Sequence, residues 1–191
     1  MSKLLKVMLG NRIDRLHTIT IKWTRATSFD KNELRRLRND KECGWYIITK
    51  LTRNGDEVPI YIGKAINCIY KRVLQHRTDD SDTPFLKKYG EKYVYIGTVQ
   101  NVTLNTKEKL RKHYHLNRLL LTVESALIQN KNDYFKKYNC NISQNVKYTR
   151  WYMLRIKNMN INETIIDHVI DNREHENVYP CPKFWKGQLM P

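Results

Sequence analysis

Four side chains that could act together on a phosphate ester lie within residues 44–76, which read GWYIITKLTRNGDEVPIYIGKAINCIYKRVLQH. Tyr46 and Tyr61 lie in two short apolar segments, and Arg72 and His76 follow four residues apart. Residues at that spacing share one face of a helix. Arginine offers a planar fork of donors for phosphate oxygens, and histidine can move a proton near neutral pH. Together they indicate phosphodiester hydrolysis, although each alone could be an ordinary strand aromatic or part of a solvated helix face.

A lone acidic residue further along the chain could complete such a site. Glu124 is the only acid in the apolar run LLLTVESALI. A buried carboxylate is costly unless it is paired or binds a metal ion, so an ion pair with Arg118 or a lysine and a metal site both stay open. A single Mg²⁺ held by one carboxylate, waters and the substrate phosphate is normal for that ion. Asn139 lies fifteen residues beyond Glu124 and is either a turn residue or a further hydrogen-bonding group.

The composition indicates a polyanionic partner. The 191-residue chain carries 35 lysines and arginines against 19 acidic residues, a formal net charge of +16. Such an excess costs stability through self-repulsion, and nucleic acid is the first candidate to balance it, before a membrane surface. No apolar run approaches the roughly 20 residues of a membrane-spanning helix, and the N-terminus lacks the pattern of a signal peptide. We therefore expect nucleic acid as the partner and no membrane.

The cysteines predict the compartment and disfavour a zinc site. None of the four belongs to a Cys-x-x-Cys pair, the usual spacing of structural zinc ligands. We expect unpaired thiols in a reducing compartment, and hence an intracellular, cytoplasmic protein. A bacterial, phage or viral origin is a separate expectation that does not follow from the cysteines. The four residues are Cys43, Cys68, Cys140 and Cys181.

Apolar periodicity and turn residues predict alternating strands and helices. Strands are expected at 17–25, 44–51, 58–63 and 92–99. Helices are expected at 28–40, 67–77, 104–130 and 162–171. Asn54-Gly55 predicts a tight hairpin turn, Ser28 or Asp30 could cap the first helix, and Asn67 could cap the second. The order hairpin, helix, strand, long helix indicates a small α/β core with extra elements at both ends.

Two short motifs in this core resemble the paired signatures of the GIY-YIG nuclease family. They are GWY at 44–46 and YIG at 61–63, with Trp45 where the family has its middle isoleucine. The pattern continues with an arginine, a histidine, a glutamate in a later helix and an asparagine. The matching residues, in order, are Tyr46, Tyr61, Arg72, His76, Glu124 and Asn139. The resemblance covers residues 44–140, and six positions in this order are far more specific than a lone YIG.

The resemblance also implies a fold and a division of the chain. We expect an α/β fold with a small, mainly antiparallel three-stranded sheet flanked by helices. A single domain of 1–191 would hold this nuclease core at 44–141. An N-terminal extension (1–43) and a C-terminal extension (142–191), for DNA binding or dimerisation, would flank it.

Each matching residue takes a role from the resemblance. Tyr46 would be the general base or would position the attacking water, although its ordinary pKa near 10 must then be lowered by Arg72, Lys64 or a metal-bound water. Tyr61 would bind the scissile phosphate or the hydrated metal. Arg72 would stabilise the charge that develops on phosphorus. Trp45 should point away from Tyr46, because neighbours on a strand face opposite sides.

The remaining residues would complete the site. His76 would assist as acid, base or phosphate ligand, and Glu124 would hold a single divalent ion near the leaving oxygen. Mg²⁺ is the expected ion, one per active site, and Mn²⁺ is expected to substitute for it. Asn139 would brace the site by hydrogen bonds. Lys64, directly after YIG, is a further candidate for a phosphate contact.

Basic and aromatic side chains outside the motifs predict the contact with DNA. Lysines and arginines gather in three segments, 33–40, 107–118 and 147–157. Their charge would bind phosphates and make the affinity depend on salt, and an aromatic ring could stack on a base. A solvated surface and ordinary core packing are the respective alternatives. The candidates are Arg35, Arg36, Arg38, Lys71, Lys109, Arg111, Lys112, Arg150, Trp151 and Arg155.

The short chain favours one branch of the family. Repair nucleases of this family carry large further domains, structure-specific resolving subunits carry a zinc-binding domain, and homing endonucleases append a longer DNA-binding region. We therefore expect a type II restriction endonuclease on double-stranded DNA. It should act as a homodimer, because one active site cuts one strand. The alternatives are a small homing or structure-directed endonuclease and a non-catalytic nucleic-acid-binding protein on a degenerate nuclease fold.

Overall fold

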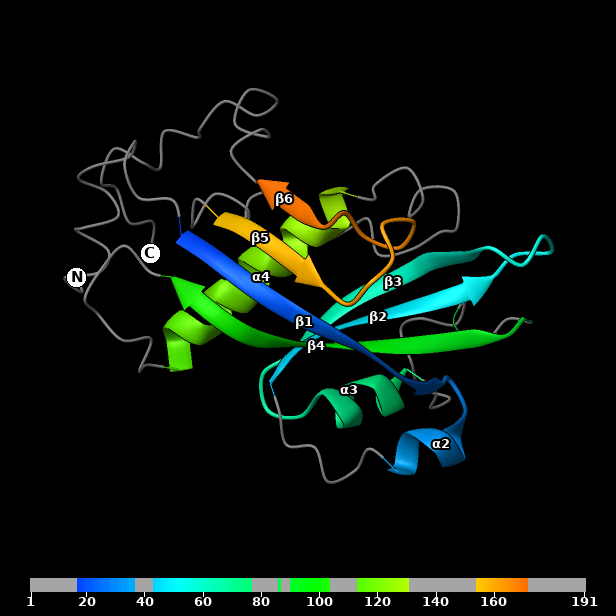
Figure 1. Cartoon of the computed structure of the whole chain (residues 1–191). Coiled ribbons are helices and arrows are strands. Elements are labelled where there is room, and N and C mark those ends of the chain that lie inside the picture. Colours follow the sequence, from blue (N-terminus) through cyan, green and yellow to red (C-terminus); the bar gives the residue numbers. More distant parts are fainter. Residues whose placement is uncertain are drawn as a thin grey trace.

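A mixed sheet of six strands carries the fold of the described residues (Figure 1). The computed structural model describes residues 17–36, 43–76, 86, 90–103, 113–130 and 154–171. The strands are β1 (His17–Ser28), β2 (Gly44–Leu51), β3 (Glu57–Ala65), β4 (Lys92–Thr103), β5 (Leu154–Met159) and β6 (Val169–Asp171). The helices are α2 (Lys31–Arg36), α3 (Ile69–Gln75) and α4 (His113–Asn130). In space the strands follow the order β3-β2-β4-β1-β5-β6.

The expected three-stranded, mainly antiparallel sheet is wrong, because the sheet is larger and mixed. β3, β2 and β4 are antiparallel neighbours, but β4 also pairs with β1, and β1 pairs in parallel with β5. Both β1 and β5 come from segments expected to be extensions. Ile19 and Ile21 of β1 and Leu154 and Ile156 of β5 are 0% exposed, so these strands form part of the core. Local alternation of apolar residues predicts a strand but does not identify its distant partner.

The hairpin of β2 and β3 places the two motif tyrosines on one face of the sheet. Tyr61 pairs with Ile48, two residues along β2 from Tyr46. The rings of the two tyrosines stack with their centroids 5.9 Å apart. In the turn, Gly55 has φ +85°, a conformation that glycine adopts without steric cost and that the sequence predicts at this position.

Neighbouring residues of β2 face different helices. Trp45 is fully buried, and its Nε1 donates a hydrogen bond to the Leu120 carbonyl of α4, 3.0 Å away. Tyr46 points to the other face, where it contacts His76 at the end of α3. The prediction that Trp45 points away from Tyr46 is therefore confirmed. Helices α3 and α4 lie on opposite faces of β2 (Figure 1).

The helix starts agree only in part with the sequence. Asp30 caps α2, since its Oδ1 accepts a hydrogen bond from the backbone N–H of Asn32 at 2.8 Å. Asn67 does not cap α3, because the N-cap residue is Cys68. Helix α4 is described from His113 onward, so the first part of the expected helix lies outside the described residues. Among the helices that the structure describes, none is long and apolar enough to cross a membrane.

The expected helix at 162–171 is wrong, because this segment forms turns and then strand β6, which pairs with β5. Buried isoleucines occupy positions 161, 165, 166 and 170, a spacing that suits a helix as well as a turn followed by a strand. Hydrogen bonds from Asn158 hold the turn. Its backbone N–H donates to the His168 carbonyl and its Nδ2 to the Asp167 carbonyl, each at 2.7 Å.

Candidate active site

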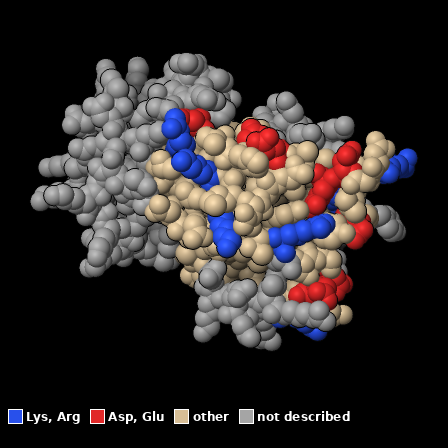
Figure 2. Space-filling view, viewed as in Figure 1, with Lys and Arg blue, Asp and Glu red and all other residues tan. Residues whose placement is uncertain are grey.

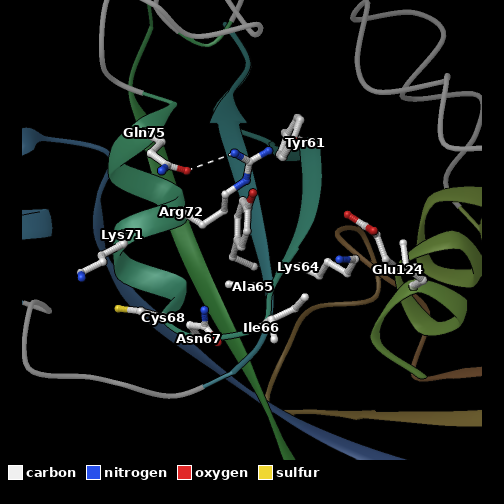
Figure 3. A pocket seen from close by; sticks show the side chains of 12 residues that line it. Tyr61, Lys64, Ala65, Ile66, Asn67, Cys68, Lys71, Arg72, Gln75 and Glu124 are labelled. Carbon is white, nitrogen blue, oxygen red and sulfur yellow. Dashed lines mark hydrogen bonds between the residues drawn. The ribbon is translucent and has the colours of Figure 1, made fainter. Parts of the chain in front are cut away.

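Five residues that the motifs single out line one pocket of about 470 Å³ at an edge of the sheet. Tyr46 comes from β2, Tyr61 and Lys64 from the edge strand β3, Arg72 from α3 and Glu124 from α4. Figure 3 shows α3 on one side of this pocket and α4 on the other. The fold therefore brings together side chains that lie far apart in the sequence.

Tyr46 and His76 form a buried pair at the pocket. The Tyr46 hydroxyl and Nε2 of His76 are 2.7 Å apart, and the two residues are 0% and 4% exposed. Tyr61 packs on the imidazole, with ring centroids 4.7 Å apart. His76 is the C-cap residue of α3, so the end of this short helix sets the position of the imidazole. The contact gives the phenol a neighbour that can take up its proton.

Burial raises the pKa of Tyr46 well above its ordinary value of 10. The neighbouring Tyr61 adds to this rise, whereas the positive charge of Arg72 lowers the pKa and has a smaller effect than burial. The phenol of the free protein is therefore neutral near neutral pH. Arg72 alone does not make it a phenolate, so a base role for Tyr46 requires a proton acceptor beside it.

Glu124 is a buried carboxylate with one oxygen that lacks a hydrogen-bond partner among the described residues. The residue is 2% exposed, and its Oε2 has no hydrogen-bond partner within the described part of the chain. Burial raises its pKa to about 7, although the charge and backbone N–H of Lys64 and the charge of Arg72 act in the opposite direction. Because an unpaired buried carboxylate is costly, this arrangement is expected where a ligand supplies the missing partner.

The pocket offers one carboxylate to a metal ion. Among the described residues, no group of three or more His, Cys, Asp and Glu side chains could hold a metal. Mg²⁺ needs no such cage, since it keeps several waters and takes few protein ligands beside substrate phosphates. Glu124, with one oxygen unsatisfied, fits that ion. The side chain of Arg118, the other partner considered for Glu124, lies outside the described residues.

Three basic side chains, Lys64, Lys71 and Arg72, line the same pocket. Arg72 is exposed, and its Nη1 donates a hydrogen bond to Oε1 of Gln75 at 3.1 Å. The Nζ of Lys64 donates to Oδ1 of Asn117 on α4 at 3.2 Å. Three cations around one acid make the pocket suitable for an anionic group such as a phosphate.

The other predicted residues lie away from the pocket or outside the described residues. Arg35 is exposed on α2, which packs against α3, and only the backbone of Arg36 is described. Arg155 lies on β5, toward the opposite end of the sheet from β3, and its Nη2 is 3.2 Å from the Asp171 carboxylate. The structure therefore does not bring Arg155 to the pocket. Outside the described residues are Arg38, Lys109, Arg111, Lys112, Asn139, Arg150 and Trp151.

The described surface carries only part of the positive charge of the chain. More than half of the 35 lysines and arginines lie outside the described residues. On the face drawn in Figure 2, basic side chains lie among acidic ones and do not merge into one patch. The DNA-contacting segments expected from the sequence therefore stay predictions.

Two amide side chains outside the predicted set accept hydrogen bonds from basic side chains of the pocket. Gln75 accepts a hydrogen bond from Arg72, three residues earlier on α3, and Asn117 accepts one from Lys64. The sequence signal for Asn117 is its place seven residues before Glu124, two helical turns away on the same face of α4.

Comparison with family models, with curated proteins and with solved structures finds no match to this chain.

Proposed function

We propose that this chain is a divalent-metal-dependent endonuclease that hydrolyses phosphodiester bonds in double-stranded DNA. The main support is the convergence of a tyrosine–histidine pair, an arginine and a buried carboxylate with an unsatisfied oxygen at one pocket. These groups match the needs of the reaction: proton transfer from water, stabilisation of charge on phosphate, and binding of a metal ion. The resemblance of GWY and YIG to the GIY-YIG signatures supports the same reaction.

The attacking water loses its proton through Tyr46 to His76. Because burial raises the pKa of Tyr46, the phenol keeps its own proton in the free protein. As the water oxygen attacks phosphorus, the bond from phosphorus to the leaving oxygen breaks. The water proton passes to the Tyr46 oxygen, and the phenol proton passes to Nε2 of His76, 2.7 Å away, in the tautomer whose Nε2 carries no proton. The leaving oxygen takes up a proton from solvent water. The imidazole ends as a cation, and no phenolate has to form beforehand.

Arg72 and Glu124 act on the charges of the reaction. The Arg72 guanidinium donates hydrogen bonds to the non-bridging oxygens, where negative charge grows as the water attacks. Glu124 would hold one Mg²⁺, or Mn²⁺ in its place, and the bound ion supplies charge neutralisation at the phosphate and the leaving oxygen. Lys64 and Lys71 add positive charge along the path of the phosphate backbone.

The finer proposal is a sequence-specific type II restriction endonuclease in the cytoplasm. The net charge of +16 supports a polyanionic substrate. One active site cuts one strand, which supports a homodimer for the cleavage of both strands. A small homing or structure-directed endonuclease would use the same pocket and differ in the DNA that it selects.

Incubation with a large genomic DNA and Mg²⁺, read on a gel beside Glu124→Gln, tests the proposal. We expect discrete fragments from the wild type and intact DNA from the variant, which loses the metal ligand but keeps its shape and its DNA affinity. A smear would support a nuclease without sequence specificity. Intact DNA in both lanes, with several divalent metals and at low salt, would overturn the proposal and favour a binding protein.

A further inference from the structure

Lys64 and Glu124 share the pocket (Figure 3), and the charge of Lys64 acts on the carboxylate, yet the two side chains form no direct ion pair. The backbone N–H of Lys64 hydrogen-bonds to the carboxylate, but its ammonium group donates to Oδ1 of Asn117 instead, at 3.2 Å. The ion pairs of the described residues do not include one between Lys64 and Glu124. Oε2 of Glu124 also has no hydrogen-bond partner among the described residues.

An ion pair would be the ordinary outcome for two such groups. Opposite charges attract strongly where water is excluded, and Glu124 is 2% exposed. A lysine ammonium sits on a flexible four-carbon stem that could carry it to the carboxylate. Asn117 offers a neutral acceptor at the place where the ammonium is found. It lies two helical turns before Glu124 on the same face of α4, so both side chains reach toward β3.

We propose that Asn117 is a positioning residue, which binds the Lys64 ammonium and thereby leaves Oε2 of Glu124 unpaired, so that a divalent cation can bind there. This inference rests on the proposed function, in which Glu124 holds the metal ion. Without Asn117, the ammonium swings to Oε2 of Glu124 and takes the place of the ion. Within the described part of the chain, the bond to Asn117 uses one of the three ammonium donors, so Lys64 can also bind a phosphate of the substrate.

Mn²⁺ binding to the full chain without DNA, followed by electron paramagnetic resonance, tests this inference without relying on cleavage. Asn117→Ala is expected to weaken Mn²⁺ binding about tenfold, the usual effect of removing a residue that orients a metal site. In a Lys64→Met background the same substitution is expected to change the affinity less than about twofold, because the competing ammonium is gone. Asn101→Ala, an exposed asparagine of β4 that does not line the pocket, is the matched control.

Thermal unfolding in metal-free buffer at pH 8 adds a second measurement. A new ion pair between Lys64 and Glu124 should leave Asn117→Ala at least as stable as the wild type, whereas a purely structural role for Asn117 predicts a lower Tm. If Asn117→Ala weakens Mn²⁺ binding equally with Lys64 and with Lys64→Met, or weakens it in neither, the inference is overturned. The metal site at Glu124 would remain in either case. Equal Mn²⁺ binding by the wild type and Glu124→Gln would instead remove the metal site from the proposed function, and this inference with it.

Discussion

The Tyr46 hydroxyl lies directly over the α-carbon of Gly63, its partner in the ladder of β2 and β3. A Cβ at position 63 would overlap with this hydroxyl and would come within 2.9 Å of the Tyr61 ring. The last residue of YIG is therefore small because the phenol of GWY must pass over it to reach His76. The two motifs form one structural unit at this point.

Gly63→Ala is expected to separate Tyr46 from His76. The added methyl group should lower the free energy of unfolding by about 1–3 kcal/mol, as overpacking usually does, and should remove most of the cleavage. Chemical denaturation and single-turnover cleavage measure the two effects. Gly55→Ala is the matched control: its surroundings are open but its φ is +85°, so it should lose stability and keep cleavage. Full activity of Gly63→Ala would contradict the placement of the phenol.

Tyr46→Phe and His76→Gln should reduce cleavage in a non-additive way. Each substitution interrupts the same proton path, so each is expected to slow single-turnover cleavage by about 10²–10⁴. The double variant should be hardly slower than either single variant. DNA affinity, measured in parallel without metal, should stay close to that of the wild type. If the two losses multiply, the residues act independently and the relay is wrong.

The buried carboxylate makes stability depend on pH. The pKa of Glu124 is raised from 4.5 to about 7 in the folded protein, so the folded state binds more protons than the unfolded state between these values. Stability from this group is fully present below pH 4.5 and is lost as the pH rises through 7. At about 1.4 kcal/mol per pKa unit, the loss is roughly 3 kcal/mol.

Glu124→Gln isolates this contribution. In metal-free buffer, the variant should gain stability over the wild type as the pH rises from 5 to 8, because the neutral amide does not titrate. Urea denaturation at both pH values measures the difference, and the effects of other titrating groups cancel in the comparison. A stability difference that does not change with pH would show that the carboxyl titrates normally.

Lys71, exposed at the rim of the pocket, should bind a DNA phosphate. Lys71→Ala is expected to weaken DNA binding for all sequences and to reduce the slope of log K against log salt by about 1. Lys22→Ala, an exposed lysine on β1, provides the comparison, since it does not line the pocket. Titrations at several salt concentrations measure both slopes, and equal slopes for both variants would place the DNA elsewhere.

Local signals in the sequence were sufficient for the hairpin but not for the sheet. Asn54-Gly55 and the flanking β-branched residues predict β2, the turn and β3, because all these interactions are close in the chain. The strand at 17–25 is also visible from its alternation. Its position between β4 and β5 depends on pairing with residues near 100 and 156, and local alternation contains no information about such partners.

The candidate site also has a part that the sequence predicts and a part that it does not. The spacing of Arg72 and His76 predicts a shared helix face, and a lone acid in an apolar run marks Glu124 as unusual. The contact of Lys64 with Asn117 could not be foreseen, because it depends on how α4 is rotated against β3. That rotation is set by packing and by the hydrogen bond from Trp45 to the Leu120 carbonyl, which a hydrophobic pattern does not specify.

The position of β1 inside the sheet determines which fragments of this protein can fold. The strands beside the pocket, β3, β2 and β4, are continuous in residues 44–103, which invites excision of the motif region as a portable module. Such a module would not stand alone, because β4 would lose its partner β1. A longer piece that keeps β1 but ends before residue 154 would still lose β5, the other partner of β1. A truncation at residue 141 would leave a bare apolar strand edge, prone to aggregation. A transplant of the pocket to another scaffold therefore has to carry strands from both ends of the chain.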